Sequence, residues 1–366
     1  MKVLIFSGKL TGGGAERVAV NMAEGLAHLG HDVVICCEPT GEQTYKPSSI
    51  VKLDFYPSQI RGSIIPKINV LARIGYMRKK IRLFNPDVII GILGDTTCMA
   101  KIAQWASFKH IPVIYTDHNT LQRPKNAPMS KRDSFLKFYF SRCCDAYTVL
   151  TEADRKYGAK CGLTNIFAMP NPLFLTPVSE LPKKEKIILA NGRLGVWHVK
   201  GFDLLLEAWG KIACEYPDWK LQILGAGSEK EKEVILQFAR DNKVEHRIEL
   251  LGYTKDVEKF YQRAEIFVLS SRYEGFGLVL TEAMSQGCAC VAADYLGRQS
   301  EIITDGIDGL LCEPDNAEDL SQKIELLLEN ENLRSSIQHS AIKGLERFSI
   351  ANYAKKWEDL IKHVLK

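Results

Sequence analysis

The chain has 366 residues, 46% of them hydrophobic and 25% charged, an ordinary composition for a globular protein of about two domains. Its formal net charge of +4 is too small to indicate a nucleic acid as partner. The N-terminal apolar run is too short for a signal peptide, and no window approaches the roughly 18 apolar residues of a membrane-spanning helix. We therefore expect a cytoplasmic protein, with any membrane contact peripheral and on the inner face of the cell membrane.

The N-terminal half alternates short apolar runs with helical patterns. The clearest helix covers residues 15–29, has its apolar residues on one face, and ends at Gly30. The apolar runs predict buried strands at residues 3–7, 32–37, 87–93, 112–116 and 145–150. Alternating strands and helices favour a parallel, doubly wound sheet.

The periodicity stops between residues 169 and 186, where four prolines precede a charged run, and this segment is the predicted linker. The alternation then resumes, with strands predicted at residues 187–191, 220–224, 248–251, 266–270, 288–293 and 310–312. Residues 316–366 have a helical pattern throughout. We therefore expect an α/β protein with two doubly wound halves and a ligand site in the cleft between them.

Three glycines at residues 12–14 separate the first strand from its helix, where they let the backbone approach a ligand at a helix N-terminus. A tight packing turn is the alternative. The dinucleotide fingerprint G-x-G-x-x-G requires a third glycine, but Arg17 occupies that position here, and Lys230 occupies it after Gly225 and Gly227. Both failures argue against a nicotinamide-dependent oxidoreductase.

Two cations, Arg193 and Lys200, follow the first strand of the second half and precede a helix. There they would hold a diphosphate, Arg with its planar fork and Lys as a point charge, and stabilise the charge that a leaving nucleoside diphosphate gains. Further on, seven residues separate Glu274 in a loop from Glu282 in a helix that begins at about Leu278. Carboxylates beside the anion site of a helix N-terminus predict a ligand with phosphate and hydroxyl groups, such as a nucleotide-sugar. The alternative for each pair is surface charges without a joint role.

His118 and Asn119 follow a predicted strand of the first half, where an imidazole donates or accepts a hydrogen bond near neutral pH. A structural His bonded to local backbone is the alternative. Asp95 has no carboxylate or His nearby, and no His/Cys cluster has zinc spacing, so we expect no metal. The ten cysteines contain no C-x-x-C, and most lie in apolar runs, as buried thiols of a reduced compartment do.

Residues 60–85 contain seven cations and no acidic residue. The cations of the helix predicted there are Lys67, Arg73, Arg78, Lys79, Lys80 and Arg82. Leu71, Ile74, Met77 and Ile81 interleave with them at helical spacing. This pattern predicts a basic amphipathic helix that contacts an anionic membrane surface or a lipid-linked substrate. The solvated face of an ordinary packed helix is the alternative.

Taken in order, these segments resemble the retaining glycosyltransferases of family 4, which share the two-domain GT-B fold. The resemblance covers most of the chain and rests on motifs at residues 13–18, 192–194, 200–205, 224–227, 274–283, 300–303 and 305–311. It implies two Rossmann-like domains that face each other across a cleft. These are an acceptor-side domain over residues 1–172, against which a terminal helix at about 350–366 packs, and a nucleotide-sugar domain over residues 183–349.

The resemblance also implies roles for individual residues. It implies donor binding by Gly13, Gly14, Arg193, Lys200, Gly225, Tyr253, Glu274, Phe276, Gly277, Leu278 and Glu282. It implies that the catalytic residues are Glu274, His118, Arg193 and Lys200, and that Glu16 and Asn119 bind the acceptor. Two segments depart from the family's pattern. The stretch between Arg193 and Lys200 is longer than usual, and Gly297-Arg-Gln replaces Gly-Gly-Pro, which would alter donor selection or merely a turn.

The chain is similar to bacterial enzymes that extend lipid-linked oligosaccharides for O-antigen, capsule or glycan-precursor synthesis. We expect metal-independent transfer without a cofactor and with retained anomeric configuration. The expected donor is a UDP-linked hexose or N-acetylhexosamine, and the expected acceptor is a glycan or a polyprenyl-linked glycan. A GDP-sugar donor and a sugar-nucleotide epimerase of similar fold are the alternatives. A two-domain binding protein fits less well, because such proteins are normally secreted.

Overall fold

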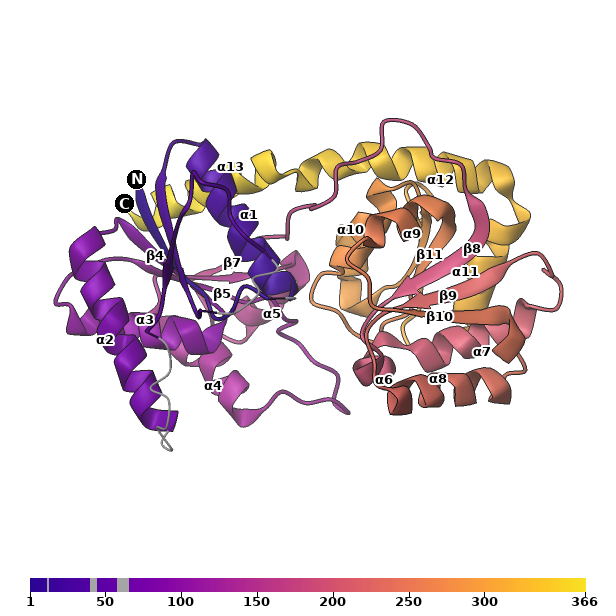
Figure 1. Ribbon diagram of the computed structural model, residues 1–366, viewed down its shortest axis with the longest axis horizontal. Helices are drawn as coiled ribbons and strands as arrows, with labels where there is room; N and C mark the ends of the chain where they lie inside the picture. The colour runs from indigo at the N-terminus through magenta and orange to yellow at the C-terminus, as the bar shows by residue number, and fades with distance from the viewer. Residues whose placement is uncertain (12, 40–44, 58–65) are drawn as a thin grey trace. The chain divides into compact units, whose positions relative to one another are not determined.

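The structure, a computed structural model, describes residues 1–11, 13–39, 45–57 and 66–366 (Figure 1). The side chains of residues 66–68 lie outside this description, as does Gly12 of the predicted glycine loop. The described chain divides into two compact units. Unit 1 combines Met1–Pro172 with Phe348–Lys366, and unit 2 consists of Leu173–Arg347.

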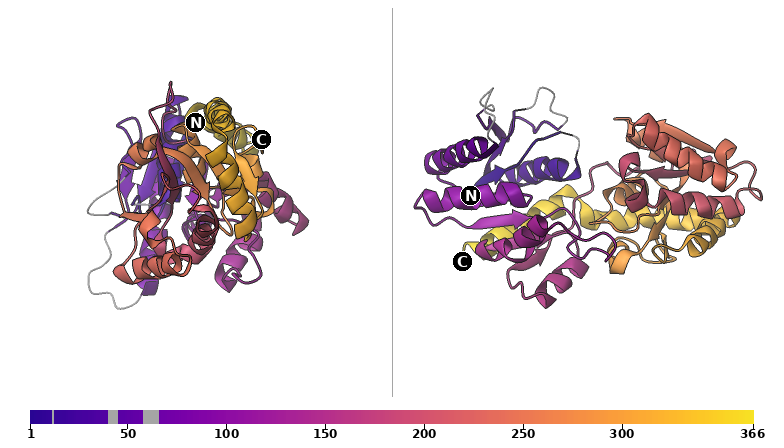
Figure 2. Two further views of the ribbon diagram at one scale, coloured as in Figure 1. Left: turned by 90° about the vertical axis from the view of Figure 1, so that its right-hand side faces the viewer. Right: turned by 90° about the horizontal axis from the view of Figure 1, so that it is seen from below.

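Unit 1 is built on a parallel sheet with the strand order β3-β2-β1-β4-β5-β6-β7 (Figures 1 and 2). The strands are β1 (Lys2–Phe6), β2 (Asp32–Cys37), β3 (Lys52–Phe55), β4 (Val88–Ile92), β5 (Val113–Thr116), β6 (Ala146–Val149) and β7 (Ile166–Ala168). The α-helices are α1 (Gly14–His28), α2 (Pro66–Phe84), α3 (Gly94–Ala106), α4 (Lys131–Phe138), α5 (Glu152–Lys160) and α13 (Ile350–Val364). Strand order and parallel pairing confirm the predicted doubly wound sheet.

Unit 2 has a second parallel sheet, in the order β10-β9-β8-β11-β12-β13. The strands are β8 (Glu185–Asn191), β9 (Lys220–Leu224), β10 (Ile248–Gly252), β11 (Ala264–Leu269), β12 (Ala289–Ala293) and β13 (Leu310–Cys312). The α-helices are α6 (Trp197–Lys200), α7 (Phe202–Ile212), α8 (Glu229–Asp241), α9 (Val257–Arg263), α10 (Leu278–Ser285), α11 (Ala317–Glu329) and α12 (Glu331–Gly344). Every strand that the sequence predicts is present in the two sheets within two residues of its expected bounds.

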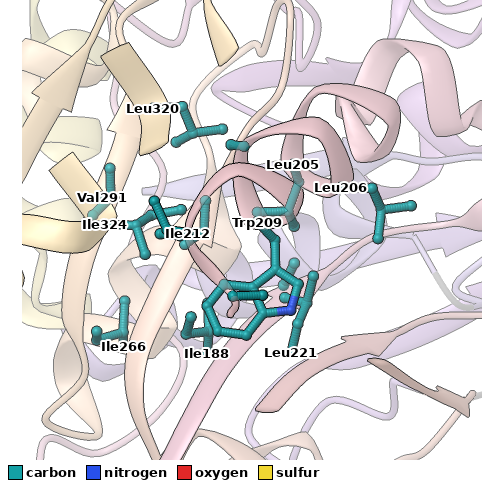
Figure 3. Close-up of a cluster of buried hydrophobic side chains, with 14 of the residues drawn as sticks. Ile188, Leu205, Leu206, Trp209, Ile212, Leu221, Ile266, Val291, Leu320 and Ile324 are labelled. Atoms are coloured by element: carbon teal, nitrogen blue, oxygen red, sulfur yellow. The ribbon is translucent and has the colours of Figure 1, made fainter. Parts of the chain in front are cut away.

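Trp209 of α7 lies in the core of unit 2. Its side chain is 1% exposed and packs among Ile188, Leu221 and Ile266 of the central strands (Figure 3). Burying an aromatic side chain of this size contributes on the order of 3 kcal/mol. This packing fixes α7 on the sheet, and with it the short helix α6, which ends at Lys200 just before α7.

The predicted helical segment at residues 316–366 is interrupted twice. Asn330 ends α11 and caps α12, its side chain accepting a hydrogen bond of 2.9 Å from the N–H of Leu333. Ser349 caps α13 in the same way. In unit 1, α13 packs against α1, where a Cβ on Gly25 would lie only 2.7 Å from the Cβ of Ala354. Glycine therefore permits the close approach of these two helices.

The α2 helix packs its apolar side into the core of unit 1. Met77 and Ile81 are fully buried, and Ile74 packs against the same core, whereas Leu71 is 70% exposed. The apolar stripe thus contacts protein, which favours an ordinary packed helix over one with a free apolar face. Of the helices in the described residues, none is long and apolar enough to cross a membrane.

Candidate active site

The predicted site residues of unit 2 gather at one edge of its sheet. Arg193 follows β8, Gly225 follows β9, Tyr253 follows β10 and Glu274 follows β11. Because these strands are parallel, their carboxyl ends meet at the same edge, which is where open α/β sheets bind ligands.

Glu274 and Lys200 form an ion pair, with 2.5 Å between Oε1 and Nζ. The Ser271 hydroxyl donates a hydrogen bond of 2.8 Å to the same carboxylate oxygen. The Glu274 and Lys200 side chains are 17% and 20% exposed, so the pair is partly shielded from water yet within reach of a ligand. The sequence predicts both charged residues but not Ser271, whose signal is its place two residues after β11.

Arg272 anchors the loop of Glu274 to the segment around Lys200. Its guanidinium donates to the two carboxylate oxygens of Asp203 at 2.7 and 2.8 Å, and to the carbonyl oxygen of His198 at 2.7 Å. Bidentate, charge-assisted contacts of this kind fix both partners. The sequence does not predict this role of Arg272, because an anchoring Arg in a loop has the same pattern as a surface charge.

The long stretch between Arg193 and Lys200 folds into two short helices, η2 (Leu194–Val196) and α6. Gly201 follows with a φ of 63°, a conformation that favours glycine. A Cβ on Gly201 would lie 2.0 Å from the carbonyl oxygen of Ser270. This close approach brings the end of α6 against the end of β11, and so sets Lys200 beside Glu274 despite the added length.

Gly225 approaches the loop of Arg193 in a similar way, since a Cβ on Gly225 would lie 1.9 Å from the carbonyl oxygen of Gly192. We expect Gly225→Ala to displace that loop and to lower the free energy of unfolding by about 1–3 kcal/mol. Urea unfolding measures the change. Ala226→Ser, at an exposed neighbour, is the control. Equal stability of Gly225→Ala and wild type would contradict the close approach.

Helix α10 begins at Leu278, as the sequence predicts. Gly277 precedes it as the N-cap residue with a φ of 98°, and a glycine has no side chain to cap the first turn. The N-terminal N–H groups of such a helix favour an anion. Phe276, next to Gly277, is 3% exposed and helps to hold the turn in place.

Glu282 lies on the buried side of α10 and is 6% exposed. The Tyr261 hydroxyl donates to its Oε2 at 3.4 Å, and Asn191 donates to the Tyr261 oxygen at 2.9 Å. Burial raises the pKa of Tyr261 well above its usual value, so the phenol stays a hydrogen-bond donor. The sequence predicts Glu282 but neither supporting residue, because both are distant along the chain.

In unit 1, Gly13 is the N-cap of α1 and Gly14 is its exposed first residue. A Cβ on Gly13 would lie 1.9 Å from Oε2 of Glu16, so the Glu16 carboxylate folds back over the glycine backbone. The dipole and free N–H groups of the first turn favour a carboxylate in this place. The loop therefore has the properties of an anion site, with Glu16 covering it.

His118 follows β5, and its Nε2 lies 3.3 Å from the Thr116 hydroxyl. Its Nδ1 is buried next to Asn171. Burial lowers the pKa of His118 to about 4, so the imidazole is uncharged at neutral pH and acts there as a neutral hydrogen-bonding group. Asn119, the next residue, is exposed.

Three of the predicted lipid-contact cations of α2 have partners within unit 1: Arg73 with Glu38 (2.8 Å), Lys80 with Asp54, and Arg78 with the carbonyl oxygen of Ala106 (2.9 Å). Lys79 and Arg82 are exposed. The side chain of Lys67 lies outside the described residues. Only part of the predicted cationic face is therefore directed to solvent.

All ten cysteines are free thiols, and six are buried, while Cys143, Cys161 and Cys214 are exposed. Burial raises the pKa of Cys36 to about 12, so this thiol stays protonated. The described part of the chain has no group of three or more His, Cys, Asp or Glu side chains that could hold a metal ion.

Two family models match the chain in succession. One, described as Glycosyltransferase Family 4, matches residues 12–174, and the other, described as Glycosyl transferases group 1, matches residues 174–344. The chain belongs to glycosyltransferase family 4. As the sequence predicts, this family 4 glycosyltransferase has the GT-B fold. One structure with this likeness, sucrose-phosphate synthase from Thermosynechococcus elongatus, has a TM-score of 0.82 at 17% identity, over 99% of this chain and 98% of that one.

Several relatives match the glycosyltransferase over nearly its whole length. An uncharacterized glycosyltransferase of Haemophilus influenzae is 28% identical over 95% of this chain and 96% of its own. The GalNAc-α-(1→4)-GalNAc-α-(1→3)-diNAcBac-PP-undecaprenol α-1,4-N-acetyl-D-galactosaminyltransferase of Campylobacter jejuni is 27% identical over 100% of this chain and 99% of its own. Anabaena HepE, solved in complex with UDP, has a TM-score of 0.80 at 19% identity, over 99% of this chain and 100% of that one.

Proposed function

We propose that this glycosyltransferase moves a hexose or N-acetylhexosamine from a UDP-sugar to a lipid-linked glycan, without metal and with retention of the anomeric configuration. The observation that carries the proposal is the Glu274–Lys200 ion pair at the sheet edge from which α10 follows. In this pair, the Glu274 carboxylate would contact the sugar and the Lys200 ammonium would bind the diphosphate. Glu282, in α10, supplies a second carboxylate for the ribose hydroxyls.

Arg193, Lys200 and the first turn of α10 stabilise the leaving group in this scheme. When the bond from the sugar C1 to the diphosphate breaks, its electron pair passes to the diphosphate oxygen. Preorganised cations and helix N–H groups lower the free energy of that developing charge. Lys200 already forms an ion pair with Glu274. A bound diphosphate therefore has to share the Lys200 ammonium with Glu274 or replace Glu274 as its partner.

Retention follows if the acceptor hydroxyl attacks C1 from the face that the diphosphate leaves. The hydroxyl proton then passes to the leaving diphosphate oxygen, and no protein base is required. Glu274, oriented by Ser271, steadies the positive charge on the sugar ring. His118 would contact a sugar hydroxyl as a neutral hydrogen-bonding group.

The name of the Campylobacter relative describes an acceptor linked through diphosphate to undecaprenol, and HepE was solved with UDP, which supports the proposed acceptor and donor classes. The exposed Tyr253 would line the uracil base, and Glu16 and Asn119 would bind the acceptor. A GDP-linked sugar is the alternative donor.

The test offers UDP-linked glucose, galactose and their N-acetyl forms to the purified protein, with and without polyprenyl-diphosphate-linked saccharides and in the presence of EDTA. We expect an acceptor-dependent product whose new bond has the anomeric configuration of the donor, measured by NMR. Conversion of one UDP-sugar into another without acceptor would indicate an epimerase. An inverted product would contradict the proposed mechanism.

The proposed membrane contact depends on the exposed cations of α2. We expect Lys79→Ala/Arg82→Ala to weaken binding to vesicles that contain anionic lipid by about thirtyfold in a pelleting assay, since each of the two cations contributes about 1 kcal/mol near such a surface. Lys355→Ala/Lys356→Ala, at exposed positions of α13 in the same unit, is the matched control. Equal pelleting of both variants and wild type would exclude α2 as the contact.

A further inference from the structure

A buried ion pair lies beneath the loop that contains His118 and Asn119. Asp117 and Lys137 approach to 2.7 Å, and their side chains are only 2% and 7% exposed. Burying two charges costs several kcal/mol each, and an apolar pair of similar size is often as stable or more so. Stability alone therefore gives no reason for this pair.

The Asp117 carboxylate joins three elements of unit 1. Asp117 is the first residue after β5, Lys137 is on α4, and Tyr147 on β6 donates to Asp117 Oδ2 at 2.8 Å. The other carboxylate oxygen accepts a bond of 3.1 Å from the backbone N–H of Asn119. One carboxylate thus fixes the backbone on both sides of His118.

A second buried carboxylate holds the far end of the same loop. Asp154, fully buried, accepts from the backbone N–H groups of Leu121 at 2.9 Å and Gln122 at 3.2 Å. Lys137 also donates to the carbonyl oxygen of Thr120 at 3.4 Å. The loop is therefore held at both ends, and His118 lies between the two anchors.

We propose that the Asp117–Lys137 pair is a positioning device, which fixes His118 and Asn119 for sugar transfer and keeps the electrostatic field at the imidazole balanced. The inference rests on the proposed function, in which His118 contacts the donor sugar. Lys137 and Asp117 act through the loop and make no contact with the reacting atoms in this scheme.

The two charges act on His118 in opposite directions. After burial, which lowers the pKa most, Asp117 raises the pKa of His118, and so does the neighbouring Asn171 side chain, while Lys137 lowers it. The neighbouring Tyr147 phenol stays neutral, because burial raises its pKa well above the usual value. Removing Lys137 alone would leave Asp117 uncompensated, so the pKa of His118 should rise.

The experiment is an NMR pH titration of the His118 ring in the full chain, with His118→Asn used to assign the signal. We expect Lys137→Met to raise the His118 titration midpoint by about one pH unit. Because the loop loses an anchor, we also expect kcat to fall about tenfold to a hundredfold, with little change in KM for the donor. Tyr147→Phe removes only one hydrogen bond and should lower kcat less.

The matched control is Lys101→Met. Lys101 is another buried lysine of unit 1, 9% exposed at its side chain and 3.2 Å from Asp145. It should lose comparable stability but keep the His118 titration and kcat of wild type. The proposal is overturned if Lys137→Met leaves the midpoint unchanged, or if Lys101→Met shifts it equally. The titration requires no substrate, so it also separates failure of this proposal from failure of the proposed function. If Lys137→Met does not fold, an unchanged kcat in Tyr147→Phe overturns the proposal.

Discussion

Replacing Glu274 by alanine is expected to lower the rate of sugar transfer by about 10²–10³-fold while UDP binding is kept. The carboxylate is the group assigned to the cationic sugar, and its loss removes a stabilisation that matters mainly in the transition state. The same change frees Lys200 from its ion pair, so the affinity for UDP should stay equal or increase. Initial rates and calorimetric titration with UDP measure the two effects.

Glu265 offers a matched control for this variant. It lies on β11, the strand that Glu274 follows, and pairs with Arg334 at 2.8 Å with a side chain that is 19% exposed. Glu265→Ala therefore removes a carboxylate of similar burial at the opposite end of the strand. It should lower stability but not kcat. A Glu274→Ala enzyme that keeps more than roughly a tenth of the wild-type rate would show that the assigned role is wrong.

The central strands could be predicted because their apolar runs are continuous, as expected for strands covered on both faces. β3 and β7 could not be predicted from the sequence, for the opposite reason. β3 reads Lys-Leu-Asp-Phe with partly exposed side chains, β7 has three residues, and both lie at the edges of the sheet. Edge position alone is not the reason, because β10 and β13, at the edges of the other sheet, are predicted from their apolar runs.

The charged residues of the candidate site were predictable, but the residues that orient them were not. Glu274 and Lys200 stand out by charge and by their position after strands. Ser271 and Asp117 act through hydrogen bonds whose partners are fixed only by the fold. Polar residues of this kind are common in loops, so their role depends on burial and geometry.

The α2 helix shows how one pattern fits two structures. A period of 3.6 residues in Ile74, Met77 and Ile81 is produced equally by a helix packed on a sheet and by one lying on a membrane. These side chains pack in the core of unit 1, so the structure agrees with a helix packed on a sheet. The cations are a separate matter, since a packed helix keeps its outer face, and there Lys79 and Arg82 remain exposed.

The second large effect is expected at Arg193. This side chain is exposed and has no ion pair within the described part of the chain, so a diphosphate can bind it without breaking an ion pair. A charge-assisted contact of this kind contributes about 1.5–3 kcal/mol, and Arg193→Ala should therefore weaken UDP binding about tenfold to a hundredfold. Lys200→Met should weaken UDP binding less. In the wild type, Lys200 must give up part of its ion pair with Glu274 to bind the diphosphate, so its net contribution to the affinity is smaller.

Calorimetric titration of both variants with UDP, UMP, GDP, ADP and NAD tests whether Arg193→Ala loses more affinity than Lys200→Met. Arg193→Ala should reduce affinity for UDP more than for UMP, since UMP lacks the second phosphate. Arg240→Ala, at a partly exposed side chain on α8, is the control and should leave both affinities unchanged. Selective binding of GDP would leave the family assignment unchanged and would make a GDP-sugar the donor. Binding of NAD without any nucleoside diphosphate would contradict the assignment of Arg193 and Lys200, because a dinucleotide site makes no use of a leaving diphosphate.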